Sequence, residues 1–159
     1  MPKPLTVLND QVREDWIDYN GHMNDADYVR AFSWAVDRFM IEIGITELFR
    51  NETLYTIFTL ENHVCYLAEM TLNEPLHVTA QILDCDEKRI HLFLELYGKN
   101  EKRAAVSEQM LMGIDQQSGR PSPFPDDIFK KLAALAAKHK TLPKPKEMGR
   151  TIQIKRKNI

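Results

Sequence analysis

Residues 18–44 read DYNGHMNDADYVRAFSWAVDRFMIEIG and join a polar loop directly to the longest helix signal in the chain. Apolar residues recur every three or four positions from Tyr28 to Ile43, which predicts an amphipathic helix over about 25–43. Asn24 is the expected N-cap, with Asp27 in the position of a weak capping box. Gly44 is suited to terminate the helix.

The polar side chains before this helix exceed what capping requires, because a cap needs only one of them. The N-terminus of a helix has unpaired backbone N–H groups and a partial positive charge, so it can polarise a carbonyl oxygen. A carboxylate beside that end can act as a base or a nucleophile. The candidate catalytic groups are Asp18, Asn20, His22, Asn24 and the backbone N–H near Asp25.

Outside the helix the hydrophobic pattern has a period of two, which is typical of strands. Strands are expected over about 5–13, 54–67, 76–84, 89–97 and 104–115, and a second helix over about 126–138 follows Pro121, Pro123 and Pro125. Short turns separate the last four strands, which favours an antiparallel meander. Alternate apolar residues in each strand, such as Val106, Met110, Met112 and Ile114, should share a face.

The expected fold class is α+β, because an apolar sheet face must be buried and the long helix is the one large partner available. We therefore expect an antiparallel sheet wrapped around that helix. The sheet would keep an open edge on each side, which favours pairing with a second copy as a homodimer or a dimer of dimers.

Length and composition suit one domain over residues 1–159, with a Pro-rich segment, terminal helix and basic tail from about 121. A net charge of −2 gives no global attraction to nucleic acid or an anionic membrane. No signal peptide and no bilayer-length apolar run is recognised. The spacing of Cys65 and Cys85 favours a reducing cytosol over a disulfide framework, and His77 and His91 lack metal-ligand spacing.

The chain resembles the hotdog-fold thioesterases, in the branch of small acyl-CoA thioesterases related to 4-hydroxybenzoyl-CoA thioesterase. That branch places an aspartate just before the central helix and an aromatic residue ten positions later, as Asp18 and Tyr28 are placed here. The plant acyl-carrier-protein thioesterases share a D-x-N-x-H pattern followed by an asparagine, which Asp18, Asn20, His22 and Asn24 match. The order of elements fits nearly the whole chain.

One position departs from the plant enzymes. They have a further acidic residue on the strand after the helix, where this chain has Cys65, with Glu61 nearby.

The resemblance implies hydrolysis of an acyl-CoA thioester, with coenzyme A as part of substrate and product and no other cofactor. Asp18 would be the attacking carboxylate or the base that activates water, and the N–H near Asp25 would polarise the thioester oxygen. Asn20 would orient water or Asp18, or serve the turn beside Gly21. His22 would shuttle a proton or hold the loop.

Aromatic residues surround the motif, and they are interpreted as substrate contacts or as core. Trp16 and Tyr19 flank Asp18 and could face an acyl group, including a quaternary ammonium through cation–π attraction. Tyr28 is a third candidate. The chain also resembles the small thioesterases of carnitine breakdown, which release glycine betaine from betainyl-CoA. The resemblance therefore leaves two substrate classes open: betainyl-CoA, or a generic short- or medium-chain acyl-CoA.

Several weaker candidates complete the predicted site. Glu61 and His63 share a strand face and would line the acyl pocket or form a solvated cross-strand pair. Lys88, Arg89 and Arg120 lie in turns and would hold the phosphates of coenzyme A or remain solvated.

Two other classes of function compete with a hydrolase. A hotdog hydratase or dehydratase usually has an aspartate and a histidine five residues apart, or an H-x-x-x-G-x-P signature, and this chain has neither, since Asp18 and His22 are four apart. A non-catalytic acyl-CoA binding module would tolerate loss of the Asp18 carboxylate.

Overall fold

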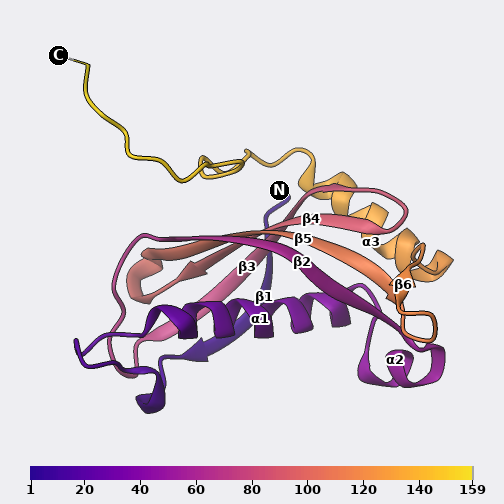
Figure 1. The fold of residues 1–159 in the computed structure, drawn as a ribbon, viewed down its shortest axis with the longest axis horizontal. Helices are drawn as coiled ribbons and strands as arrows, with labels where there is room; N and C mark the ends of the chain where they lie inside the picture. Colours follow the sequence, from indigo (N-terminus) through magenta and orange to yellow (C-terminus); the bar gives the residue numbers. More distant parts are fainter. Residues whose placement is uncertain (159) are drawn as a thin grey trace.

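The computed structural model describes residues 1–158 and shows one curved sheet with α1 packed across its inner face (Figure 1). In chain order the elements are β1 (Leu5–Gln11), the 3-10 helix η1 (Glu14–Trp16), α1 (Asp25–Glu42), α2 (Glu47–Thr53), β2 (Tyr55–Tyr66), β3 (Pro75–Cys85), β4 (Arg89–Tyr97), the 3-10 helix η2 (Lys99–Glu101), β5 (Arg103–Asp115), β6 (Arg120–Pro121) and α3 (Asp126–His139). Within residues 1–158 no helix combines the length and the apolar character that crossing a membrane requires.

The strands pair in the order β1-β3-β4-β5-β2, and every pairing is antiparallel. The predicted α+β class and antiparallel sheet are confirmed, but a four-strand meander is wrong. Only β3, β4 and β5 form a meander, because β2 pairs with β5 and residues 67–74 cross from one side of the sheet to the other. The edge strands are β1 and β2.

On β3 and β4 the helix-facing side of the sheet is apolar. On α1 the buried residues recur with helical spacing, and alternate residues of β3 and β4 meet them. The fully buried positions include Ala31, Phe32, Ala35 and Phe39 of α1, Val78 and Ala80 of β3, and Ile90, Leu92, Leu94 and Leu96 of β4. This agrees with the sequence pattern, and such burial stabilises the fold by about 1.5–3 kcal/mol for each large side chain.

The apolar residues named for β5 share a face as predicted, but that face is turned away from α1. Ser107 and Gln109 are cross-strand partners of Leu94 and Leu92, so they occupy the helix-facing side. Val106, Met110 and Met112 alternate with them and lie on the outer side. The polar pair forms a buried ladder in which Gln109 Nε2 donates to Ser107 Oγ and Ser107 Oγ donates to Asn62 Oδ1.

The two ends of α1 agree only in part with the caps predicted from the sequence. Asn24 occupies the N-cap position, but its side chain accepts no bond from the helix, and Asp27 bonds Arg30 instead of closing a capping box. Gly44 ends the helix as expected, with a positive φ of 97°. The short helix α2 was not predicted, although Thr46 caps it by accepting the N–H of Phe49.

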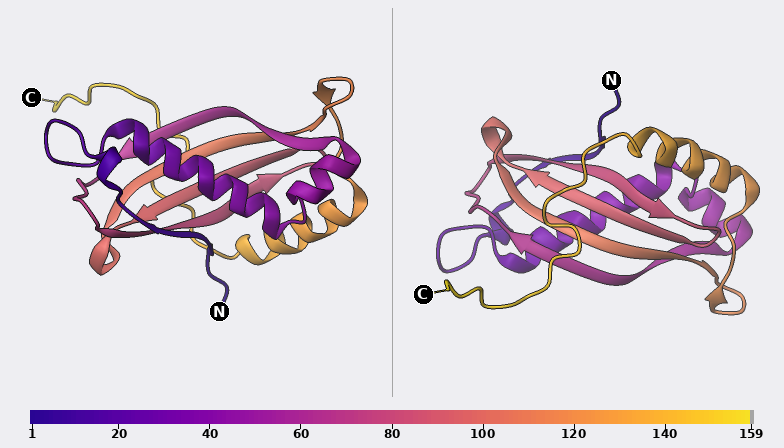
Figure 2. Two further views of the ribbon diagram at one scale, coloured as in Figure 1. Left: turned by 90° about the horizontal axis from the view of Figure 1, so that it is seen from below. Right: turned by 90° about the horizontal axis from the view of Figure 1, so that it is seen from above.

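After α3 the chain crosses the sheet face opposite α1, as the right-hand view of Figure 2 shows. We call residues 140–150 the C-terminal strap. Glu147 accepts two hydrogen bonds from the Arg103 guanidinium, at 2.9 and 3.0 Å, and the N–H of Gly149 donates to Glu108 at 2.7 Å. These contacts fix the strap against β5.

The helix α3 is joined to the sheet by a bond that depends on pH. Nδ1 of the buried His139 accepts the N–H of Ile82 at 2.9 Å, beside the irregularity in β3. Burial lowers the pKa of His139 below its ordinary value of 6.5. Below pH 6.5 the unfolded chain therefore binds a proton that the folded protein takes up only at lower pH, and stability falls as the pH falls.

We predict that His139→Asn, which keeps an acceptor near the Nδ1 position, removes this dependence. The difference in free energy of unfolding between wild type and His139→Asn should shrink below pH 6.5, by up to about 1.4 kcal/mol per pH unit. Urea unfolding at pH 7.5, 6.5 and 5.5 measures it. A difference that is constant across this range would show that His139 does not contribute the linkage.

Candidate active site

The loop before α1 is a small hairpin that presents Asp18. Ile17 and Met23 form an isolated antiparallel bridge, and the N–H of Asp18 donates to the carbonyl of His22 at 3.0 Å. The intervening turn requires Gly21, whose φ is +78°. Three-residue loops with glycine in the left-handed region are a common hairpin connection.

Asp18 lines a cavity of about 590 Å³ at the N-terminus of α1. One carboxylate oxygen, Oδ1, accepts the N–H of Asn20 at 2.8 Å. At the first residue of α1, the N–H of Asp25 has no acceptor within residues 1–158, as expected for the first turn of a helix. The cavity therefore contains a carboxylate and a free donor, the two groups that thioester hydrolysis needs.

The opposite wall of the cavity comes from the end of β2 and from residues 67–74, here called the crossover. The hydroxyl of Tyr28 donates to the carbonyl of Ala68, and that of Tyr66 donates to the carbonyl of Asp25, both at 3.1 Å. The two tyrosine rings meet edge to face with centroids 5.3 Å apart. These contacts hold the helix N-terminus against the crossover.

Burial, with a smaller contribution from the charge of Glu74, raises the pKa of Tyr28 to about 12. Burial and then Asp25 also raise the pKa of Tyr66. Both phenols are neutral donors at neutral pH, so neither serves as a base there.

His22 connects the hairpin to the crossover. Its Nε2 lies 3.2 Å from the Glu69 carboxylate, and the next residue, Met23, donates its N–H to the carbonyl of Met70 at 2.9 Å. His22 thus joins the two walls of the cavity.

The cavity brings together most of the predicted site. Its lining consists of Asp18, Tyr19, Asn20, His22, Met23, Asn24, Asp25, Tyr28, Tyr66, Leu67, Ala68 and Glu69. Three carboxylates and three tyrosines stand in this set, and it contains no lysine or arginine. Within residues 1–158, no three ligand-type side chains converge in a way that could hold a metal ion.

Trp16 does not line the cavity. It is 2% exposed, its ring lies 5.6 Å from that of Trp34, and the Arg13 guanidinium lies over both rings, at 5.3 and 4.7 Å from their centroids. Because Arg13 already supplies the cation, the structure argues against a substrate contact at Trp16. Tyr19, in contrast, is 97% exposed at the cavity rim.

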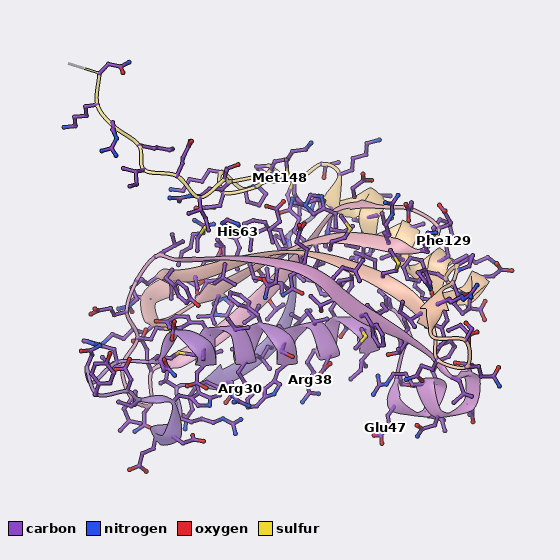
Figure 3. The ribbon with its side chains drawn as sticks, in the orientation of Figure 1. Arg30, Arg38, Glu47, His63, Phe129 and Met148 are labelled. Carbon is purple, nitrogen blue, oxygen red and sulfur yellow. The ribbon has the colours of Figure 1, made fainter. Side chains whose placement is uncertain are left out.

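Glu61 and His63 lie away from the cavity of their own chain. They are cross-strand partners of Met110 and Glu108 on the outer sheet face, and Figure 3 shows His63 directed toward the strap near Met148. The expectation that they line the acyl pocket is therefore not met within one chain, because the sheet separates them from α1.

Lys88, Arg89 and Arg120 lie near the opposite end of the sheet. Arg89 pairs with Met112 of β5, whereas Tyr66 pairs with Ala105. Seven residues of strand separate these levels, or roughly 23 Å. The guanidinium of Arg89 also holds Asp86, which lowers the pKa of that carboxyl to about 2.

Five residues of the cavity lining were not predicted: Met23, Tyr66, Leu67, Ala68 and Glu69. Tyr66 and Glu69 are the two whose side chains have polar groups. Tyr66 ends a strand whose return toward the helix N-terminus depends on its pairing with β5, and no local pattern reveals that pairing. Glu69 lies in the crossover, where hydrophobic periodicity is absent. An aromatic residue ending a long strand is the one available signal for Tyr66.

Comparisons with known proteins agree with this geometry. A family model described as the thioesterase-like superfamily matches residues 12–132. The betainyl-CoA thioesterase of Pseudomonas aeruginosa is 37% identical over 97% of this chain and 98% of its own length. A Rhizobium sp. L-carnitine dehydrogenase/betainyl-CoA thioesterase is 34% identical over 97% of this chain, which spans 31% of that longer protein.

A solved structure is also similar over nearly its full length. It is a hypothetical protein of Staphylococcus aureus in complex with CoA, with a TM-score of 0.91, 36% identity and 98% of each chain covered. Together with the hotdog architecture, the family match and the full-length relative show that this chain belongs to the thioesterase-like superfamily and is a thioester hydrolase.

Proposed function

We propose that this acyl-CoA thioesterase hydrolyses betainyl-CoA to glycine betaine and coenzyme A. The observation that carries the proposal is the charge of the cavity, which has Asp18, Asp25 and Glu69 in its lining and no basic side chain other than His22. A betainyl group has a fixed positive charge close to the thioester carbonyl. Carboxylates and the faces of Tyr19, Tyr28 and Tyr66 stabilise such a cation. The full-length relative from Pseudomonas aeruginosa supports the same substrate.

In the proposed reaction the thioester carbonyl oxygen accepts a hydrogen bond from the backbone N–H of Asp25. Asp18 then either activates a water molecule or attacks the carbonyl carbon itself. As a general base, Asp18 takes a proton from water while the water oxygen bonds to the carbonyl carbon. The C–S bond then breaks, and the proton held by Asp18 passes to the leaving sulfur to give the thiol and the free acid.

As a nucleophile, the Asp18 oxygen bonds to the carbonyl carbon, the C–S bond breaks and the coenzyme A thiolate leaves to be protonated by solvent. Water then hydrolyses the resulting anhydride to the free acid and the Asp18 carboxylate. Asn20 holds the Asp18 carboxylate through its backbone N–H in either case.

These steps need only water, so coenzyme A enters solely as part of the substrate and leaves as product. Cys65 and Cys85 are both free thiols. Free cysteines are usual in a reducing cytosol, where acyl-CoA thioesters are used, and we propose that compartment for the reaction.

Asp18→Asn should retain the fold and the affinity for acyl-CoA but lose turnover on the order of 10²-fold or more, because an amide neither accepts the proton nor attacks. Free-thiol release measures the rate, and thermal unfolding checks the fold. Asp15→Asn, an exposed change in η1, is the matched control. Retained turnover in Asp18→Asn would remove this residue from the chemistry.

A neutral isostere separates charge from shape in substrate choice. We expect kcat/KM for betainyl-CoA to exceed that for 3,3-dimethylbutyryl-CoA by at least about tenfold, since one cation–π contact alone is worth about 0.5–2 kcal/mol. Glu69→Gln should reduce the ratio, whereas Glu52→Gln on the exposed surface of α2 should not. Equal rates on both substrates would contradict the betainyl assignment but leave thioester hydrolysis intact.

We further propose that the protein is a homodimer formed along β2. This edge strand leaves one row of backbone groups unpaired over Tyr55–Tyr66, and its exposed side chains include Phe58, Leu60 and Tyr66. A long apolar edge is a template for pairing with a second copy. Two-fold symmetry makes the pairing antiparallel, so the far end of the partner's sheet approaches the cavity. Lys88 and Arg120 would then lie nearer the cavity than they do within one chain, so their predicted contact with phosphate stays an alternative for the binding test below.

Leu60→Lys should disrupt that pairing by placing a charge on the edge. Light scattering after gel filtration should give wild type twice the 18.5 kDa of one chain, and the variant close to 18.5 kDa. Leu48→Lys, on exposed α2, should leave the mass unchanged. A monomeric wild type would exclude the dimer, and four times the chain mass would indicate a dimer of dimers.

A further inference from the structure

A second hollow, of about 340 Å³, lies where the C-terminal strap continues into residues 150–158, here called the basic tail. It is lined by Lys146, Glu147, Arg150, Thr151, Gln153 and Lys155. Three cations and two neutral side chains with hydrogen-bond donors therefore surround a space large enough for phosphate groups.

Among residues 1–158, no carboxylate forms an ion pair with the cations of this hollow. Its one carboxylate, Glu147, is held by both terminal nitrogens of Arg103, and those bonds keep the pKa of Glu147 below its ordinary value. The side chains of Lys146, Arg150 and Lys155 form no ion pair with any part of the chain between residues 1 and 158. The hollow thus has three cations against one carboxylate, and that carboxylate is bonded to Arg103.

The position of the hollow is determined by the anchored strap. Besides the Arg103 contact, Gln81 donates to the carbonyl of Pro143 and Glu108 accepts the N–H of Gly149. From there the basic tail leaves the outer sheet face and extends away from it, toward the same end of the long axis as the Asp18 hairpin (Figures 1 and 2).

An acyl-CoA has several phosphate charges, and the cavity around Asp18 offers them none of the cations they require. A thioester seated there must place its nucleotide outside that cavity. Phosphates bind where lysine and arginine side chains converge with hydroxyl or amide donors.

We propose that the hollow of the basic tail binds the phosphate groups of the coenzyme A nucleotide, while the flexible pantetheine arm reaches the Asp18 cavity around the end of the sheet. This inference rests on acyl-CoA being the substrate. In this arrangement the acidic cavity binds the acyl group, and the hollow of the basic tail binds the nucleotide.

The test compares betainyl-CoA with S-betainyl-pantetheine, which has the same thioester and no phosphate. In Lys146→Ala/Arg150→Ala/Lys155→Ala, KM for betainyl-CoA should rise on the order of tenfold, with kcat and the pantetheine kinetics unchanged. The matched control is Lys3→Ala/Lys130→Ala/Lys140→Ala, which removes the same charge from exposed sites. Wild-type KM for betainyl-CoA should also rise with salt, and the tail variant should be less sensitive.

Direct binding separates this inference from the proposed reaction. Calorimetry with coenzyme A and with adenosine 3′,5′-bisphosphate should show weaker binding to the tail variant than to the control, even if betainyl-CoA were not the substrate. Equal affinities in both variants, or a loss confined to Lys88→Ala/Arg120→Ala, would overturn the assignment. Inorganic phosphate and adenosine 3′,5′-bisphosphate are then compared as competitors of coenzyme A binding. If both weaken that binding equally, the hollow is a general phosphate site and the assignment to the nucleotide is wrong.

Discussion

The buried carboxylate of Glu74 fixes the crossover, residues 67–74, on which both the strand order and the cavity depend. Glu74 is 5% exposed and accepts the N–H groups of Thr71 and Lys99, at 3.2 and 3.1 Å. Burial alone would raise the pKa of this carboxyl, but these bonds and nearby Lys102 outweigh burial and lower it. Gly98 has no space for a Cβ, which would lie 2.2 Å from Glu74 Oε2. The ionised carboxylate thereby fixes the end of the crossover against β4.

The crossover lets one edge of the sheet meet the N-terminal hairpin. It connects β2 to β3 across the sheet, and its residues supply the carbonyls of Ala68 and Met70 and the carboxylate of Glu69 to the opposite wall. The base of the hairpin is fixed separately, because Arg13 lies over Trp16 and Trp34 and the N–H of Asn24 donates to the carbonyl of Trp16 at 2.8 Å. Asp18 is positioned by these two supports.

Local patterns predicted the elements well but not how they pair. The helical repeat located α1 to within one residue, and alternation located the strands, because each signal depends on one buried face. The partner of β2 was missed because any antiparallel order satisfies the same alternation. The shared apolar face of β5 was predicted, but not that its polar face meets the helix. Ser107 and Gln109 satisfy much of their bonding inside the core, so polarity there does not indicate solvent.

The site residues also fall into those that local sequence predicts and those that depend on long-range strand pairing. Asp18, Asn20, His22 and Asn24 could be predicted because they are close in sequence and next to a helix start. Tyr66 and Glu69 reach the cavity through long-range pairing, which a single sequence does not encode locally. Trp16 was predicted as a substrate contact or as core. In the structure it is buried beneath Arg13, three residues earlier, and does not line the cavity.

The acidic lining of the cavity also has a consequence for turnover. Hydrolysis converts an uncharged thioester into a carboxylate, and the new anion forms among Asp18, Asp25 and Glu69. Like charges at such short range repel, and the repulsion grows as water is excluded. The acid product is therefore less stable in the cavity than the thioester it came from, so the same carboxylates that surround the acyl group also promote product release and oppose inhibition by accumulated acid.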